Sequence, residues 1–172
     1  IQPYSPKAGT GLSSHELNMP GTYRDVKDTT IVAQFKVAPS TFKVEVLESA
    51  FNEGNLYILA WTTTPWTLPS NTALTVGKNI EYALVKTYNQ YTNEPIHVVL
   101  ASNLIGKQFT GKFEAVEGDA QWAEYTAESK KVPYYVVDTF KGSDLLEVRY
   151  EQLLPFCLPM ENADQAFRVI PG

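Results

Sequence analysis

The sequence predicts a mainly β fold of the α+β kind, a β-barrel with a few peripheral helices. Short runs that alternate apolar and polar residues, the period of half-buried strands, recur along the chain. Eleven prolines and ten glycines interrupt these runs, as is typical of turns between strands. At 172 residues, 44% of them hydrophobic, the chain is long enough to bury one sizeable core.

The first 22 residues form an irregular segment rich in proline and glycine, in which His15 is expected to be a surface residue. Residues 23–28 carry alternating charges and are expected to form a solvated edge. Residues 52–55 mark a turn, and residues 89–93 mark the tip of a hairpin. Strands are expected at residues 30–37, 42–48, 56–60, 73–76, 81–88, 96–101 and 134–140.

Two helices are predicted in the second half of the chain. A short one begins at residues 102–106 with Ser102 as its cap, and the clearest one spans residues 143–154, before Pro155. The polar stretch at residues 111–131 is expected to be a peripheral insertion. His97 lies in the second hairpin strand and is expected to be a half-buried strand residue rather than a metal ligand, since no second histidine or carboxylate is spaced to join it.

Charge and cysteine content exclude several function classes. The net charge of −5 argues against autonomous nucleic-acid binding, because such proteins usually present a clustered basic face. The apolar runs are all shorter than the roughly 20 residues that span a bilayer, so no membrane partner is predicted. The lone Cys157 excludes an internal disulfide and a cysteine-based zinc site, and it favours a cytoplasmic location.

The most informative stretch runs from Trp61 to Ala73, Trp-Thr-Thr-Thr-Pro-Trp-Thr-Leu-Pro-Ser-Asn-Thr-Ala. Each of its prolines removes a backbone donor and favours extended geometry in the residue before it. The preceding strand should therefore stop near Thr64 and give way to a rigid loop that ends at Asn71. Such a loop offers hydroxyls and one carboxamide without charge, which suits a sugar, a nucleoside or an ordered water. The alternative is that these threonines are ordinary strand residues.

This thirteen-residue stretch resembles the threonine-rich peptide of the editing domain inserted in isoleucyl-tRNA synthetases, members of the class I aminoacyl-tRNA synthetases. The related valyl and leucyl enzymes carry Thr-Thr-Arg-Pro there, whereas Thr64-Pro65-Trp66 takes the isoleucyl form. Residues 23–28 resemble the segment before the first strand of the same domain. The resemblance implies the barrel fold of the valyl, isoleucyl and leucyl editing domains.

The resemblance also implies a function. The isoleucine-selecting pocket of a synthetase cannot strongly reject valine, and isoleucyl-tRNA synthetase is the standard example of this limit. The editing domain hydrolyses the ester of mischarged Val-tRNA(Ile). By matching position, Thr63 and Asn71 would be catalytic residues. Thr62, Thr64, Trp66 and Thr67 would bind substrate, with Trp66 as part of the wall that judges side-chain size.

No metal or cofactor is implied for this reaction. The implied partners are the valine-carrying 3′ end of tRNA(Ile) and the remaining domains of the parent synthetase.

Other family signatures have no counterpart within residues 1–172. These are the Gly-Thr-Gly…His…Asp-Asp segment of the editing domain and the His-Ile-Gly-His and Lys-Met-Ser-Lys-Ser motifs of the synthetic site. The chain is therefore expected to be a single editing domain, residues 1–172, excised from a larger synthetase and poorly active alone. The alternative is a catalytically silent structural or RNA-docking β-module of the parent protein.

Overall fold

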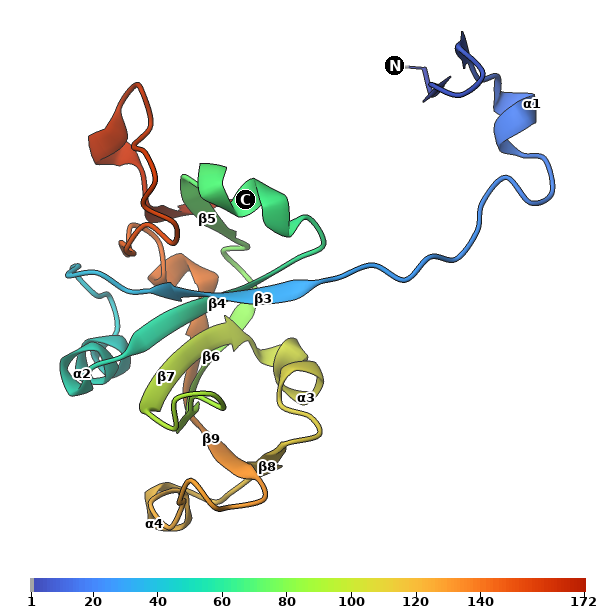
Figure 1. The fold of residues 1–172 in the computed structure, drawn as a ribbon. Coiled ribbons are helices and arrows are strands. Elements are labelled where there is room, and N and C mark those ends of the chain that lie inside the picture. Colours follow the sequence, from blue (N-terminus) through green and yellow to red (C-terminus); the bar gives the residue numbers. More distant parts are fainter. Residues whose placement is uncertain (1) are drawn as a thin grey trace.

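The computed structural model describes residues 2–172, which form a β-rich body and an N-terminal arm that extends away from it (Figure 1). The strands are β1 Tyr4–Ser5, β2 Thr10–Gly11, β3 Ile31–Lys36, β4 Leu56–Thr62, β5 Ala73–Val76, β6 Glu81–Tyr88, β7 Pro95–Ala101, β8 Phe113–Ala115, β9 Val132–Lys141 and β10 Arg168–Pro171.

Helices are few and short. The α-helices are α1 Ser14–Leu17, α2 Glu45–Glu53, α3 Ile105–Gln108 and α4 Asp119–Trp122, and the 3-10 helices are η1 Pro65–Ser70, η2 Ser102–Leu104, η3 Gly142–Asp144 and η4 Ala163–Gln165. Within residues 2–172, no helix has the length and apolar character needed to cross a membrane.

The body is built on a mixed six-stranded sheet in the order β3-β4-β7-β6-β9-β8. The pairs β4–β7 and β8–β9 are parallel, and the other neighbours are antiparallel. A separate parallel pair joins β10 to β5. The predicted mainly β class is confirmed. In the described part of the chain the sheet does not close on itself, because β3 and β8 remain its edges, so the expected barrel is an open sheet here.

The central strands bury both of their faces. Along β6, Leu84 packs in one hydrophobic cluster, while its neighbours Ala83 and Val85 pack in another. Successive side chains of a strand point to opposite faces, so the two clusters lie on opposite sides of the sheet. Leu47 of α2 belongs to the first cluster, and Phe109, at the end of α3, belongs to the second.

Most predicted strands are confirmed with small shifts in their ends. The exception is residues 42–48, where α2 begins at Glu45 instead of a strand. The alternation over residues 42–48 is too short to distinguish a strand from a helix. The buried residues that follow, Leu47 and Ala50, have the three-residue spacing of a helix face. Strand β10, which was not predicted, pairs with β5.

The predicted helix at residues 143–154 is wrong. Only the turn η3 forms, and Glu147 then adopts a left-handed backbone conformation with φ of 71° that stops any helix. The backbone of residues 147–150 instead bonds to the chain around β10: Glu147 N–H donates to Val169 O, and Tyr150 N–H donates to Phe167 O. Tertiary pairing therefore overrides the helical period of this segment.

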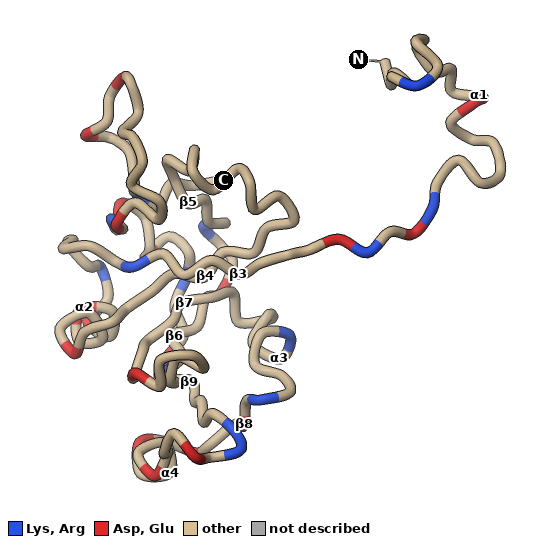
Figure 2. Tube along the Cα trace, viewed as in Figure 1, with Lys and Arg blue, Asp and Glu red and all other residues tan. Residues whose placement is uncertain are grey.

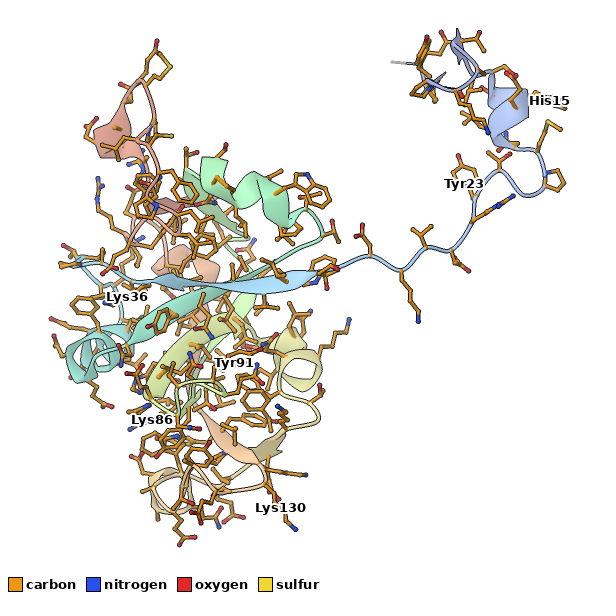
Figure 3. The ribbon with its side chains drawn as sticks, viewed as in Figure 1. His15, Tyr23, Lys36, Lys86, Tyr91 and Lys130 are labelled. Carbon is orange, nitrogen blue, oxygen red and sulfur yellow. The ribbon has the colours of Figure 1, made fainter. Side chains whose placement is uncertain are left out.

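Three smaller predictions have mixed outcomes. A short helical segment does follow β7, as η2 and α3, but Ser102 does not cap it: its buried hydroxyl has no hydrogen-bond partner within residues 2–172. Residues 111–131 form β8 and α4 at one end of the sheet (Figure 1). His15 is exposed on the arm, as predicted, and Figure 3 shows it together with Tyr23, far from the sheet.

Candidate functional site

The candidate site is the threonine loop, defined here as residues 62–71, which follows β4. The strand ends at Thr62, which pairs with Ile31 of β3. The chain then bends and enters η1, with Pro65 in its first turn. Proline suits this position because its φ is preset and the N–H it lacks would be unpaired there. The expected rigid loop is thus a 3-10 helix, and Leu68 packs it against the first hydrophobic cluster.

Three of the predicted threonines are joined by hydrogen bonds. The hydroxyl of Thr64 lies 3.3 Å from that of Thr62 and 3.4 Å from that of Thr67. The Thr64 N–H donates to Thr62 Oγ1 at 3.0 Å, and Thr67 Oγ1 donates to Thr64 O at 2.7 Å. These bonds fix the exit from β4 and leave hydroxyl valences directed to solvent.

Thr63 and Trp66 stand outside this network. The Thr63 hydroxyl is exposed and makes no hydrogen bond to any of residues 2–172. Trp66 is 68% exposed on η1, and Trp61, at the end of β4, is 64% exposed. Sequence reasoning did not single out Trp61 as a site residue. An unpaired hydroxyl and a large exposed indole are groups that a ligand can still engage.

Asn71 is held by the protein on three sides. Its backbone N–H donates to Leu68 O at 3.0 Å, and its Nδ2 donates to Ala73 O at 3.0 Å. Its Oδ1 accepts a 2.6 Å hydrogen bond from the phenol of Tyr150. The predicted site is therefore not one continuous cluster, because the Asn71 amide bonds to Ala73 and Tyr150 and not to the threonine hydroxyls.

Tyr150 was missed as a site residue by sequence reasoning. It is 2% exposed and packs edge-on against Phe35 at 5.2 Å and against Phe167 at 6.1 Å between ring centroids. Burial raises the pKa of its phenol well above the usual value, so the group stays protonated and able to donate. No local pattern could reveal its contact with a residue 79 positions away.

The loop belongs to an uncharged stretch of the chain. Residues 54–77 contain no Asp, Glu, Lys or Arg, so the tube in Figure 2 stays tan from β4 to β5. A site of this kind offers hydrogen bonds from hydroxyls and amides without a counter-charge for a phosphate or a metal ion. Within residues 2–172, His, Cys, Asp and Glu side chains form no group of three that could hold a metal ion.

A second polar group lies away from the loop, between the sheet and α4. Lys86 Nζ is 3.2 Å from Glu53 Oε2, 3.1 Å from Asp119 Oδ1 and 4.6 Å from the ring centre of Trp122. Figure 3 shows Lys86 in the sheet on the side of α4. The Lys86 cluster, as we call it, consists of Glu53, Lys86, His97, Asp119, Trp122 and Tyr135.

The charges of this cluster satisfy one another. Burial lowers the pKa of Lys86, but hydrogen bonds and charge from Asp119 and Glu53 outweigh that effect and raise it overall. A 2.7 Å hydrogen bond from Tyr135, together with one from Lys86, lowers the pKa of Asp119. His97 is buried rather than half-buried, and burial lowers its pKa in spite of Glu53 at 3.5 Å.

Comparisons with known proteins show what the chain is similar to. An isoleucine–tRNA ligase of Bacteroides thetaiotaomicron is 54% identical over an alignment of 180 positions that covers the whole chain and 15% of that ligase. The chain is homologous to a segment of isoleucine–tRNA ligases. The ligase of Cytophaga hutchinsonii is 51% identical, and that of Clostridium tetani is 39% identical, again over the whole chain. The chain spans only 12–15% of the length of these three ligases.

The fold resembles that of a solved structure. The crystal structure of GlLeuRS-CP1 matches 84% of this chain and 48% of its own, with a TM-score of 0.50 and 16% sequence identity. At that identity the likeness establishes a shared fold alone. No family model matches the chain.

Proposed function

We propose that this chain is the editing domain of an isoleucine–tRNA ligase and that it hydrolyses the ester linking valine to the 3′ end of mischarged tRNA(Ile). The observation that carries the proposal is the threonine loop, a rigid strand exit whose hydroxyls keep free valences and whose residues carry no charge, in a segment homologous to such ligases. The other partners are the remaining domains of the ligase, and the site of action is the cytosol.

The loop can supply what ester hydrolysis requires. A water must be positioned beside the carbonyl carbon, and the oxyanion that develops must be stabilised by preorganised donors. Thr63 offers a hydroxyl free to accept from the water or donate to the ester. Asn71 retains one Nδ2 hydrogen beyond the one it gives to Ala73 O. These two residues are the proposed catalytic residues.

The remaining loop residues would bind the substrate. The hydroxyls of Thr62, Thr64 and Thr67 form a connected row whose free valences suit the ribose hydroxyls of a terminal adenosine. Trp66 presents an exposed indole beside this row and is the proposed wall that admits valine and excludes isoleucine. Because the indole is exposed in the unliganded domain, its role as a wall needs the substrate to pack against it.

The test is deacylation of Val-tRNA(Ile) by a full-length ligase that contains this segment. The Thr63→Ala, Asn71→Ala double variant should hydrolyse Val-tRNA(Ile) at least about tenfold more slowly, the effect of losing about 1.4 kcal/mol of transition-state hydrogen bonding. Isoleucine charging should continue. Valine should accumulate on tRNA(Ile), because its hydrolysis from the tRNA is slowed. The matched control is Thr139→Ala, which removes an exposed strand hydroxyl on β9. Hydrolysis at the wild-type rate by the double variant would remove Thr63 and Asn71 from the mechanism.

A further inference from the structure

We infer that Tyr150 is a positioning residue of the threonine loop, which holds the Asn71 amide in the single orientation that the editing reaction uses. The inference rests on the proposed function. It concerns a contact between a buried aromatic core and the exposed loop, with 2.6 Å between Tyr150 Oη and Asn71 Oδ1.

The direction of this hydrogen bond follows from its neighbours. The Nδ2 of Asn71 faces Ala73 O, which can only accept, so the amide nitrogen must be on that side. Turning the amide over would place Oδ1 against the carbonyl oxygen of Ala73, two acceptors without a hydrogen between them. The oxygen therefore faces Tyr150, and the phenol is the donor.

The phenol is in turn a fixed point. Tyr150 pairs through its backbone with Val37, and its backbone N–H donates to Phe167 O. Phe35 and Phe167 contact its ring, and the side chain is buried. A buried ring between two aromatic neighbours cannot move its hydroxyl without disturbing the core. The phenol therefore anchors Asn71 from the core side of the loop.

The Asn71 amide gives one N–H to Ala73 O and accepts the Tyr150 hydroxyl with one lone pair of Oδ1. One N–H of Nδ2 and one lone pair of Oδ1 then remain for a ligand. Both are fixed in direction because the amide is planar and is held at each end. Without the phenol, Asn71 would be fixed only through Nδ2 and its backbone, and χ2 could rotate. A misplaced donor lowers the rate of a reaction that depends on preorganised hydrogen bonds.

The test is a double-mutant cycle in the full-length ligase, read out as the rate of Val-tRNA(Ile) deacylation. Tyr150→Phe removes only the hydroxyl and should slow editing about three- to tenfold, the range expected for one hydrogen bond. Asn71→Ala should slow it at least as much, and the double variant should match Asn71→Ala alone, since Tyr150 acts through Asn71. Tyr134→Phe is the control: this ring stacks on Phe109 at 4.4 Å, and its hydroxyl makes no hydrogen bond within residues 2–172.

The outcomes separate this inference from the proposed function. A wild-type ligase that does not hydrolyse Val-tRNA(Ile) would overturn the proposed function. Slow editing by Asn71→Ala with a wild-type rate for Tyr150→Phe would overturn the positioning role alone. If the rate reduction in the double variant equals the product of the two single-variant reductions, the positioning role is also overturned, because Tyr150 then acts independently of Asn71. The unfolding free energy of each variant, measured on this 172-residue chain, identifies any loss that is due to misfolding.

Discussion

The threonine loop and the Lys86 cluster are both polar, yet they differ in charge and in how completely their groups are paired. The Lys86 cluster joins α2, β6, β7, α4 and β9, and in it the half-buried ammonium of Lys86 is paired with the exposed carboxylates of Glu53 and Asp119. The loop has no charge, and its hydroxyls bond only to near neighbours or to nothing within residues 2–172. Charged, mutually satisfied groups between elements are typical of structural clusters, whereas rigid groups with spare valences can bind a ligand.

The comparison predicts that the cluster matters mainly for stability. Lys86→Met keeps the apolar stem but leaves Glu53 and Asp119 without their shared cation. We expect a loss of about 1–3 kcal/mol in the free energy of unfolding, the range for removing one partner from a charge-assisted group. The carboxylates are themselves exposed, which keeps the loss below that of a fully buried pair. Urea denaturation of this chain measures the change in the free energy of unfolding. A decrease of less than about 0.5 kcal/mol would contradict a structural role for the cluster.

The second prediction concerns Asn71, where the loop meets the core. Asn71→Asp retains the acceptor for Tyr150 but turns the Nδ2 donor into an oxygen that faces Ala73 O. We expect the free energy of unfolding to fall by about 1–2 kcal/mol at neutral pH, because the new carboxylate oxygen then faces the carbonyl oxygen of Ala73, two acceptors in a half-buried site. Asn103→Asp, on the exposed η2, makes the same charge change and is the control. Equal stability of the two variants would show that the Ala73 contact is unimportant.

The third prediction uses the pH dependence of the cluster. Burial lowers the pKa of His97 in the folded state below its ordinary value of 6.5. The unfolded chain therefore binds the proton more readily, and the stability contributed by neutral His97 is lost as the pH falls below about 6.5. In His97→Gln the unfolding free energy should fall less steeply between pH 6.5 and pH 5. Parallel curves for the two proteins would contradict the burial-lowered pKa.

The smallest stability change is expected for the exposed side of the loop. Trp66→Ala should alter the free energy of unfolding by only about 0.5 kcal/mol, since the indole is exposed and not part of the core. In the full-length ligase the same variant should begin to hydrolyse correctly charged Ile-tRNA(Ile), because the proposed wall is gone. Trp61→Ala removes the other exposed indole, at the end of β4, and is the control. A folded Trp66→Ala ligase that still spares Ile-tRNA(Ile) would place the size filter elsewhere.

Sequence reasoning succeeded where structure depends on local pattern. The strands around the threonine loop and the hairpin of β6 and β7 follow from alternation and turn residues. The end of β4 near Thr64 follows from the two prolines, although the 3-10 helix was read as a loop. The six loop residues were singled out by resemblance, and their functional roles stay predictions.

Failures occurred where distant segments decide the outcome. Residues 143–154 have helical spacing, but their backbone bonds to Phe167 and to β10, which local spacing does not reveal. The Tyr150–Asn71 contact and the Lys86 cluster join residues far apart in the chain, so neither appears in any local window. Whether the sheet closes into a barrel or stays open likewise depends on which strands pair, and the pattern of a single strand does not reveal its partners.

We propose that substrate meets the threonine loop and not the Lys86 cluster. Amide hydrogen–deuterium exchange on the full-length ligase tests it, with and without tRNA(Ile) carrying valine through a non-hydrolysable amide link. We expect slower exchange in peptides covering residues 61–72 and unchanged exchange in peptides covering residues 82–88 and 117–123. Protection confined to the peptides of the Lys86 cluster, or unchanged exchange in residues 61–72 with the tRNA fully bound, would contradict it.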